Sequence, residues 1–212
     1  MLPDLDRSRL LRRLPALALA WGGLTLTVLA GGAQALLLAH PVFEAEVEAL
    51  MPAYIAKIQP RSVADHEPGG DIVLVVHAIR PDPISGDHAV SPWIDMQESV
   101  DAGHEWVPTI ILVSMILAWP WRRRSDAARA IALALGASAL LLAWTVPVHL
   151  AGLYELNLQR VAASFHEVRD RPWFLGQMIF FESGGLWLLA LSLAAAIVFG
   201  VNRPARTQAA KA

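Results

Sequence analysis

Cysteine is absent from the 212 residues, and charged residues are scarce. Without a thiol, the chain forms no disulfide, offers no thiolate ligand to a metal ion and contains no cysteine nucleophile. Asp, Glu, Lys and Arg together make up 17% of the residues, whereas a soluble domain carries about a quarter. Hydrophobic residues make up 55% and gather in long runs, so the composition predicts a protein that crosses a membrane several times.

Two apolar runs in the middle of the chain, 107–121 and 130–154, fix the predicted topology. Neither contains Asp, Glu, Lys or Arg, and apolar residues surround each helix completely instead of marking one face, as in membrane spans. The loop between them, 122–129, holds four arginines and one aspartate. Because short loops rich in Lys and Arg stay in the cytoplasm, this loop is predicted inside and residues 40–105 outside.

The first apolar run, 15–38, contains 24 residues without a charge and follows the basic segment 1–13. This length is sufficient to cross a hydrocarbon core of about 30 Å. Two interpretations stay open: a retained membrane anchor, or a signal peptide cleaved near Ala33-Gln34-Ala35. Because a signal peptide normally has an apolar region of about 7–15 residues, we expect the anchor.

The chain is therefore predicted to be an all-α membrane protein with four transmembrane helices, a small α+β extracytoplasmic insertion between the first two, and both termini inside. The expected segments are, in order, a cytoplasmic N-terminus (1–13), helix 1 (14–39), the extracytoplasmic insertion (40–105), helix 2 (106–121), a cytoplasmic loop (122–129), helix 3 (130–154), an extracytoplasmic amphipathic segment (155–174), helix 4 (175–201) and a cytoplasmic tail (202–212).

The outer insertion is predicted to contain a helix followed by a β-hairpin. Apolar residues recur at near-helical spacing across 41–57, before the break at Pro60. A Val- and Ile-rich stretch, 72–79, has the composition of a strand, and 88–96 is expected to return as its partner. A lone hairpin is marginal in water, so it must pack on a helix, on the membrane or on another protein. Segment 155–174 is expected to continue the third span as a helix or to lie in the interface.

Histidines are concentrated in the outer insertion, among many carboxylates. The candidate metal ligands are His77 and His88, which face each other on the expected hairpin, together with His104. Histidine and carboxylate suit zinc, copper or iron. Their spacing matches no known metal motif, so the alternative is a set of solvated histidines in an acidic loop, and no cofactor is expected. The insertion also contains His40 and His66.

Glu182 interrupts the last apolar run, and His149 lies near the outer end of the third. A carboxylate inside an apolar run is costly and usually has a reason. Both side chains are predicted near the outer boundary, so they can meet, and a proton-relay or ligand role is one interpretation. The other is structural: Glu182 caps the start of the fourth helix, where its charge suits the helix dipole. We favour a structural role with an inward-facing partner.

Several function classes find no support in the sequence. There is no Gly-x-Ser-x-Gly motif, and no serine has an evident His and Asp set, so an enzyme is not expected. No basic patch with interleaved aromatic residues is present, so nucleic acid is not an expected partner. A transporter subunit has little support, because the spans contain few polar groups.

The order of segments carries a resemblance. A basic N-terminus and a long first span come first, then a strand led by Gly69-Gly70-Asp71, a second strand at 90–96, and a Pro108-containing span, 107–118, that closes on arginines. This layout resembles the small membrane proteins that accompany exosortases, in particular the exosortase H-associated family. The resemblance implies a multi-pass, N-in/C-in protein of a bacterial inner membrane, and a cysteine transpeptidase-like sorting enzyme as its partner. It carries over no functional residue.

Two functions are predicted from these observations. The first is a non-enzymatic inner-membrane accessory protein of an exosortase-type envelope protein-sorting system. Besides membrane lipids, it would contact its partner by strand addition at the uncovered edge of the hairpin. The alternative is a metal- or small-ligand-binding membrane protein that uses the extracytoplasmic cluster of histidine and acidic residues together with Glu182.

Overall fold

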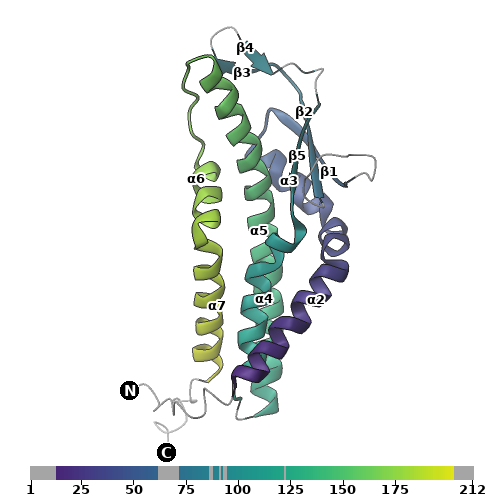
Figure 1. Cartoon of the computed structure of the whole chain (residues 1–212), viewed down its shortest axis with the longest axis vertical. Helices are drawn as coiled ribbons and strands as arrows, with labels where there is room; N and C mark the ends of the chain where they lie inside the picture. Colours follow the sequence, from purple (N-terminus) through teal and green to yellow (C-terminus); the bar gives the residue numbers. More distant parts are fainter. Residues whose placement is uncertain are drawn as a thin grey trace, which may run out of the picture. The chain divides into compact units, whose positions relative to one another are not determined.

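The structure is a computed structural model that describes residues 13–61, 72–85, 88–90, 92, 95–121 and 123–202. The described chain is mostly helical, with one three-stranded and one two-stranded sheet (Figure 1). It divides into two compact units, each described by itself. Unit 1 consists of the chain up to Thr27, of Val107–Leu141 and of the part from Trp187 onward. Unit 2 consists of Val28–Trp106 and Leu142–Leu186.

Among the residues that the structure describes, three helical segments are long and apolar enough to cross a membrane. They are α2 (Leu14–Leu38), α5 (Arg124–Ser164) and Trp173–Val201, which is composed of α6 (Trp173–Phe180), a π-helical turn η1 (Phe181–Gly185) and α7 (Leu186–Val201). A fourth helix, α4 (Ala102–Ala118), is equally apolar but has 17 residues. The apolar runs thus form helices, as predicted. The helix of the third run continues into the second outer segment, past Pro147, as far as Ser164.

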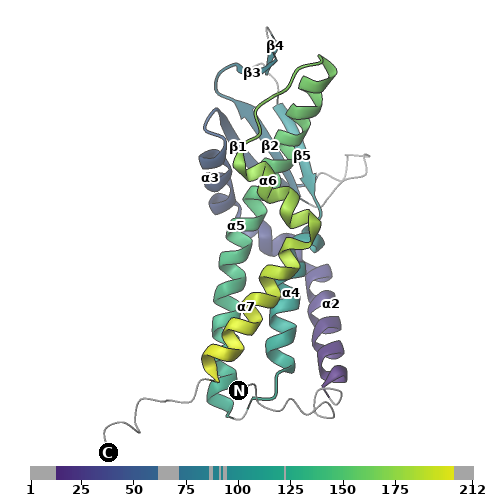
Figure 2. The same ribbon diagram turned by 90° about the vertical axis from the view of Figure 1, so that its left-hand side faces the viewer.

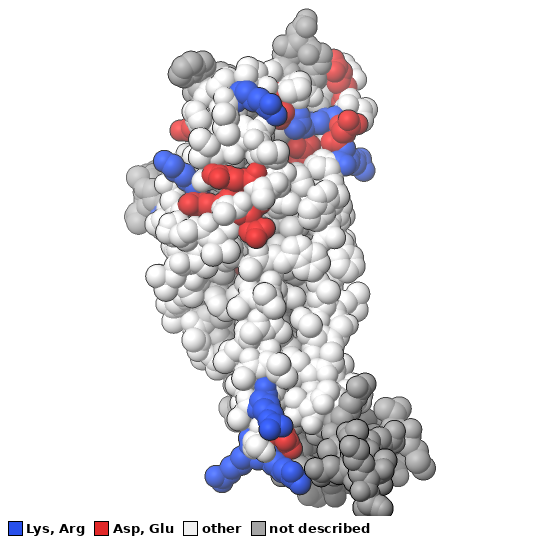
Figure 3. All heavy atoms as spheres, turned by 180° about the vertical axis from the view of Figure 1, so that it is seen from behind, with Lys and Arg blue, Asp and Glu red and all other residues white. Residues whose placement is uncertain are grey.

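The core of unit 1 combines branched side chains of α4 with alanines of α5 and α7. Ala130 and Ala134 lie one turn apart on α5, and Ala190 and Ala194 do so on α7, and all are buried against residues such as Ile116. Small side chains at this spacing let helix backbones approach closely, which is how helices associate in lipid. Figure 3 shows a cluster of Lys and Arg on this unit next to a large uncharged surface, as lipid contact requires.

Unit 2 contains a helix and an antiparallel sheet, seen from two sides in Figures 1 and 2. The helix is α3 (His40–Leu50). The sheet has the order β1-β2-β5. Its strands are β1 (Tyr54–Pro60), β2 (Ile72–Ala78) and β5 (Asp95–Val100), and between β2 and β5 the short strands β3 (Asp82–Ser85) and β4 (His88–Val90) pair with each other.

This sheet corrects two predictions. The expected helix over 41–57 ends at Leu50, and its last part belongs to strand β1, because every second residue from Tyr54 to Ile58 is buried in the sheet. The expected hairpin of 72–79 with 88–96 is also wrong. Strand β2 pairs with β1 on one side and β5 on the other, so a three-stranded sheet replaces the hairpin.

The outer edge of β1 is closed by two carboxylates from α3. Ala56 N donates to Glu48 Oε1 at 3.1 Å, and Ile58 N donates to Glu44 Oε1 at 2.8 Å. The spacings match, because four residues of helix advance about 6 Å and two residues of strand about 7 Å. Phe43 and Val47, each one residue before these glutamates on α3, are buried. This edge of the sheet, on β1, is therefore occupied by side chains of the protein itself.

Candidate functional site

A buried carboxylate–imidazole pair lies at the start of α4. Glu105 is in the first turn of this helix, where a negative charge suits the helix dipole, and it is 1% exposed. Asp101 caps the turn by accepting a hydrogen bond from Gly103 N at 2.7 Å. The carboxylate oxygen Oε1 of Glu105 pairs with Nδ1 of His149, which is 8% exposed on α5. Glu105 therefore fixes the orientation of the imidazole and directs its Nε2 atom away from the pair.

Two further side chains meet the free nitrogen of His149. Its Nε2 atom lies 2.9 Å from Glu182 Oε1, and His104 Nε2 lies 3.4 Å from the same oxygen. Each of these three residues offers one potential ligand atom, and the three atoms all lie within 4.8 Å of one another. The side chains of His104 and Glu182 are 44% and 45% exposed, so the cluster is buried on the His149 side and open on the other.

Glu182 reaches this position because it lies in the π-helical turn η1, between α6 and α7. The helical segment begins at Trp173, with Pro172 as its N-cap, so Glu182 does not start this segment. It lies shortly before the start of α7, and its role as a cap of that helix stays a prediction. The helical path is broken within η1, where two helices meet at a kink. Gly184 has φ +99°, a conformation that side chains disfavour, and a Cβ atom on Gly185 would lie 2.3 Å from the Phe180 ring.

Close approach of α5 and α6 brings the two halves of the cluster together. A Cβ atom at Gly152 would lie 2.5 Å from Cβ of Met178. Gly152 follows His149 by three residues, and Met178 precedes Glu182 by four. Because residues three and four apart share a face of a helix, the glycine contact lies one turn from the His149–Glu182 contact.

The structure groups some of the predicted site residues and separates others. His149 and Glu182 meet, as their common position near the outer boundary suggested, and His104 joins them. His77 lies on β2, with its Nδ1 atom 2.9 Å from Asp95 Oδ1, whereas His88 is on β4 in the other sheet, so the expected pairing of these two is wrong. The remaining histidines of the insertion are His40, whose Nδ1 atom lies 2.8 Å from the Leu37 carbonyl, and His66, which lies outside the described residues.

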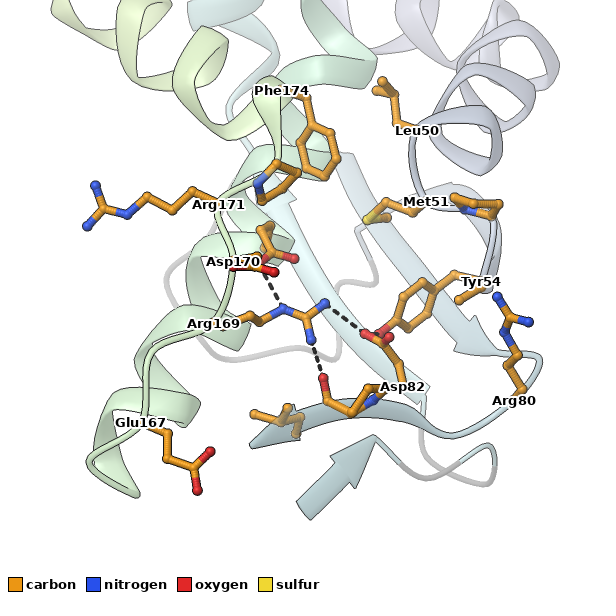
Figure 4. A pocket seen from close by; sticks show the side chains of 16 residues that line it. Leu50, Met51, Tyr54, Arg80, Asp82, Glu167, Arg169, Asp170, Arg171 and Phe174 are labelled. Atoms are coloured by element: carbon orange, nitrogen blue, oxygen red, sulfur yellow. Dashed lines mark hydrogen bonds and ion pairs between the residues drawn. The ribbon is translucent and has the colours of Figure 1, made fainter. Parts of the chain in front are cut away.

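A second polar group of unit 2 is centred on Arg169, in the segment between α5 and α6. Its Nη2 atom donates to Asp82 Oδ2 at 2.8 Å, its Nε atom donates to Glu155 Oε1 at 2.9 Å, and Nη1 donates to the Pro83 carbonyl (Figure 4). Burial opposes the charge of Arg169, but the neighbouring carboxylates outweigh it and raise the pKa of the guanidinium above its ordinary value. The arginine thus fastens the 165–172 segment to strand β3.

Tyr54 extends this network into the sheet. Its hydroxyl donates to Asp82 Oδ2 at 2.7 Å, and its ring packs edge-on against Tyr154 with 5.1 Å between the centroids. Burial, together with Tyr154 and the Asp82 carboxylate, raises the pKa of the Tyr54 phenol above its ordinary value. The hydroxyl therefore stays protonated and keeps donating to Asp82.

An open hollow of about 670 Å³ lies beside this network. Figure 4 shows Leu50, Met51 and Phe174 on one side of it, with the Arg169 network across from them and the side chains of Arg171 and Glu167 pointing away. Apolar walls with a few fixed polar groups are typical of surfaces that bind an apolar side chain. No signal in the sequence distinguished these residues from ordinary polar loops.

Comparisons of the chain with protein-family models, with curated proteins and with solved structures find no match.

Proposed function

We propose that the chain is a non-enzymatic accessory protein of a bacterial inner membrane, with four spans and both termini inside, whose extracytoplasmic segments bind a protein partner. The hollow beside Arg169 carries this proposal. It is framed by apolar side chains, it is held in shape by a charged network, and it lies on loops and a sheet edge where protein contacts are commonly made.

Helix lengths support the topology. At 1.5 Å per residue, the segments Arg124–Ser164 and Trp173–Val201 are both longer than a hydrocarbon core of about 30 Å is thick. With the arginine-rich loop at the inner surface, the proposed topology has His149 and Glu182 near the outer boundary. The fourth span is α4, whose 17 residues suit a nearly upright helix.

The proposed partner is a multi-pass sorting enzyme of the exosortase type, as the resemblance of the layout implies. Strand addition at β1 is not the proposed route, because Glu44 and Glu48 occupy the amides that an added strand would need. The route proposed instead is insertion of an apolar side chain of the partner between Met51 and Phe174, next to the fixed polar groups.

Site-specific photocrosslinking in the native host tests the proposal. A photoreactive amino acid at Arg80, which lines the hollow, should give a crosslinked product, and mass spectrometry should identify a membrane enzyme with a cysteine nucleophile. Lys57 provides the matched control, because it is also an exposed cation of unit 2 but lies on β1 outside the hollow. Equal products at both positions, or none at Arg80, would contradict the hollow as the binding surface. A different protein captured at Arg80 would contradict the sorting enzyme alone.

A further inference from the structure

We infer that His104, His149 and Glu182 bind a divalent first-row transition-metal ion, with zinc the best fit, at the junction of α4, α5 and η1. The site is independent of the proposed partner. Its ligands would be Nε2 of each histidine and one carboxylate oxygen of Glu182. Two histidines and one carboxylate form a donor set that zinc and iron accept in proteins, with further positions left for water or another ligand.

The distances between the potential ligand atoms fit such an ion. Zinc bonds of about 2.0–2.1 Å in a tetrahedron place the ligand atoms about 3.3 Å from one another. Glu182 Oε1 lies 2.9 Å from His149 Nε2 and 3.4 Å from His104 Nε2, and no pair in the group is farther apart than 4.8 Å. Small side-chain rotations of the half-exposed Glu182 and His104 therefore suffice to place the three atoms around one ion.

Glu105 gives the independent second observation. A metal-binding histidine usually donates its other ring N–H to a carboxylate, which fixes the tautomer and orients the ring. Glu105 pairs with His149 Nδ1 in this way, and it is itself 1% exposed. Its second oxygen, Oε2, is buried without a hydrogen-bond partner among the residues that the structure describes. A role in orienting a metal ligand accounts for a carboxylate that is buried at this cost in free energy.

Charge balance also favours a dication. Two carboxylates and two imidazoles meet here, and Glu105 and His149 are buried. Buried charge is costly unless it is paired, and among the described residues no lysine or arginine is paired with Glu105 or Glu182. A divalent ion neutralises the group, and the open side next to His104 and Glu182 leaves a coordination position that faces outward.

Metal titration of the full chain in detergent tests the inference. After chelator treatment, the protein should bind one equivalent of Zn²⁺ by calorimetry, and one equivalent of Co²⁺ should give the visible absorption of a four-coordinate complex. The His104→Ala and Glu182→Gln variants should lose this equivalent, since both side chains are half exposed and their replacement leaves the fold intact. Glu105→Gln should bind about 10–100-fold more weakly.

His77→Ala is the matched control. The Nδ1 atom of His77 also lies 2.9 Å from a carboxylate, that of Asp95, but His77 is on strand β2 and does not belong to the cluster. This variant should bind as the wild type does. The inference is overturned by a wild-type protein that binds no stoichiometric equivalent, which would leave a hydrogen-bonded cluster without metal. It is equally overturned by binding that survives in both ligand variants, or that disappears in His77→Ala. If a ligand variant does not fold, the wild-type stoichiometry and the His77→Ala result still decide.

Discussion

At the scale of single residues, one charged side chain of unit 2, Arg169, holds the segment between α5 and α6 in place. Arg169 contacts two carboxylates and one carbonyl, which lie on β3 and α5, and the acceptors on β3 are 86 and 87 positions away in the sequence. The planar guanidinium has donors in a fixed fork, so one side chain can hold several acceptors in a defined geometry. A point charge such as an ammonium group cannot replace this set of contacts.

Replacing Arg169 by lysine should therefore destabilise the protein. The variant keeps the charge but leaves at least one acceptor of the buried Glu155 or of Asp82 without its donor, at a cost of roughly 1–3 kcal/mol. Thermal unfolding in detergent measures the change. The matched control is Arg171→Lys, two residues along the same segment, whose side chain points away from the network in Figure 4. Equal unfolding temperatures for the two variants would show that the contacts of Arg169 contribute nothing.

Glu98, on β5, is predicted to make stability depend on pH. Burial raises the pKa of its carboxyl above the ordinary value of 4.5, although Asn157 donates to the carboxylate. The folded state thus binds the proton more tightly than the unfolded state, so the free energy of unfolding falls as the pH rises through and beyond 4.5. Glu98→Gln should raise the unfolding temperature at pH 7.5 and change it less at pH 4.

The control for this prediction is Glu46→Gln, a substitution of the same kind on the exposed side of α3. It should leave the unfolding temperature unchanged at both pH values. A gain for Glu98→Gln of the same size at pH 4 and pH 7.5 would argue against a cost of charge at this position and for a packing effect.

Sequence could predict part of the candidate site, for identifiable physical reasons. His149 and Glu182 stand out because polar side chains in apolar runs are costly, and both lie near the same predicted boundary. Glu105 was missed because a carboxylate just before an apolar run looks like an ordinary boundary residue. The contacts of Arg169 could not be predicted, because Asp82 lies 87 positions away in the chain and its strand was not expected.

At the scale of elements, the absence of a side chain at one glycine lets two helices pack closely. Gly152 allows α5 to approach Met178 of α6, and this approach supports the contact between His149 and Glu182 one turn away. A glycine in a helix normally lowers stability by about 0.5–1 kcal/mol relative to alanine, so its presence at a contact requires a reason. The space beside Met178 provides this reason.

Gly152→Ala should lower stability, because its Cβ atom would lie 2.5 Å from Cβ of Met178 and the two helices must move apart. The expected loss is roughly 1–3 kcal/mol, as for other overpacked positions, with weaker metal binding in the same variant. Gly136→Ala, on the same helix, is the control, since nothing lies within 4 Å of its added Cβ atom. It should be neutral or slightly stabilising. An unchanged unfolding temperature for Gly152→Ala would contradict the close approach of α5 and α6.

The elements themselves were predicted unevenly. Apolar runs predict helices well, because a backbone in lipid must satisfy its hydrogen bonds internally. Strand β1 was not predicted, because its alternation covers few residues and merges with the helical spacing of α3. Strand β5 has the sequence Asp-Met-Gln-Glu-Ser-Val, with little β-branched or aromatic character, and becomes a strand through pairing with β2.

At the scale of the whole molecule, the distribution of charge along the sequence is the main argument for orientation. Residues 1–13, 122–129 and 202–212 together carry 11 of the 17 lysines and arginines, whereas residues 40–106 carry 12 acidic and three basic residues. Two apolar runs lie between each of these three basic segments and the next, so all three segments fall on one side of the proposed four-span arrangement. Basic residues in short loops resist translocation, so the proposed orientation has this side in the cytoplasm.

Because the chain contains no native cysteine, single cysteines can test this topology directly. A cysteine in place of Ser125, in the arginine-rich loop, should resist a membrane-impermeant maleimide in intact cells and react once the cells are lysed. A cysteine in place of Lys57, an exposed position of β1, should react as soon as the outer membrane is permeabilised. The lysed samples control for accessibility, since both positions are exposed. Labelling of Ser125→Cys before lysis, with Lys57→Cys protected, would invert the topology and place the histidine–carboxylate cluster near the cytoplasmic surface.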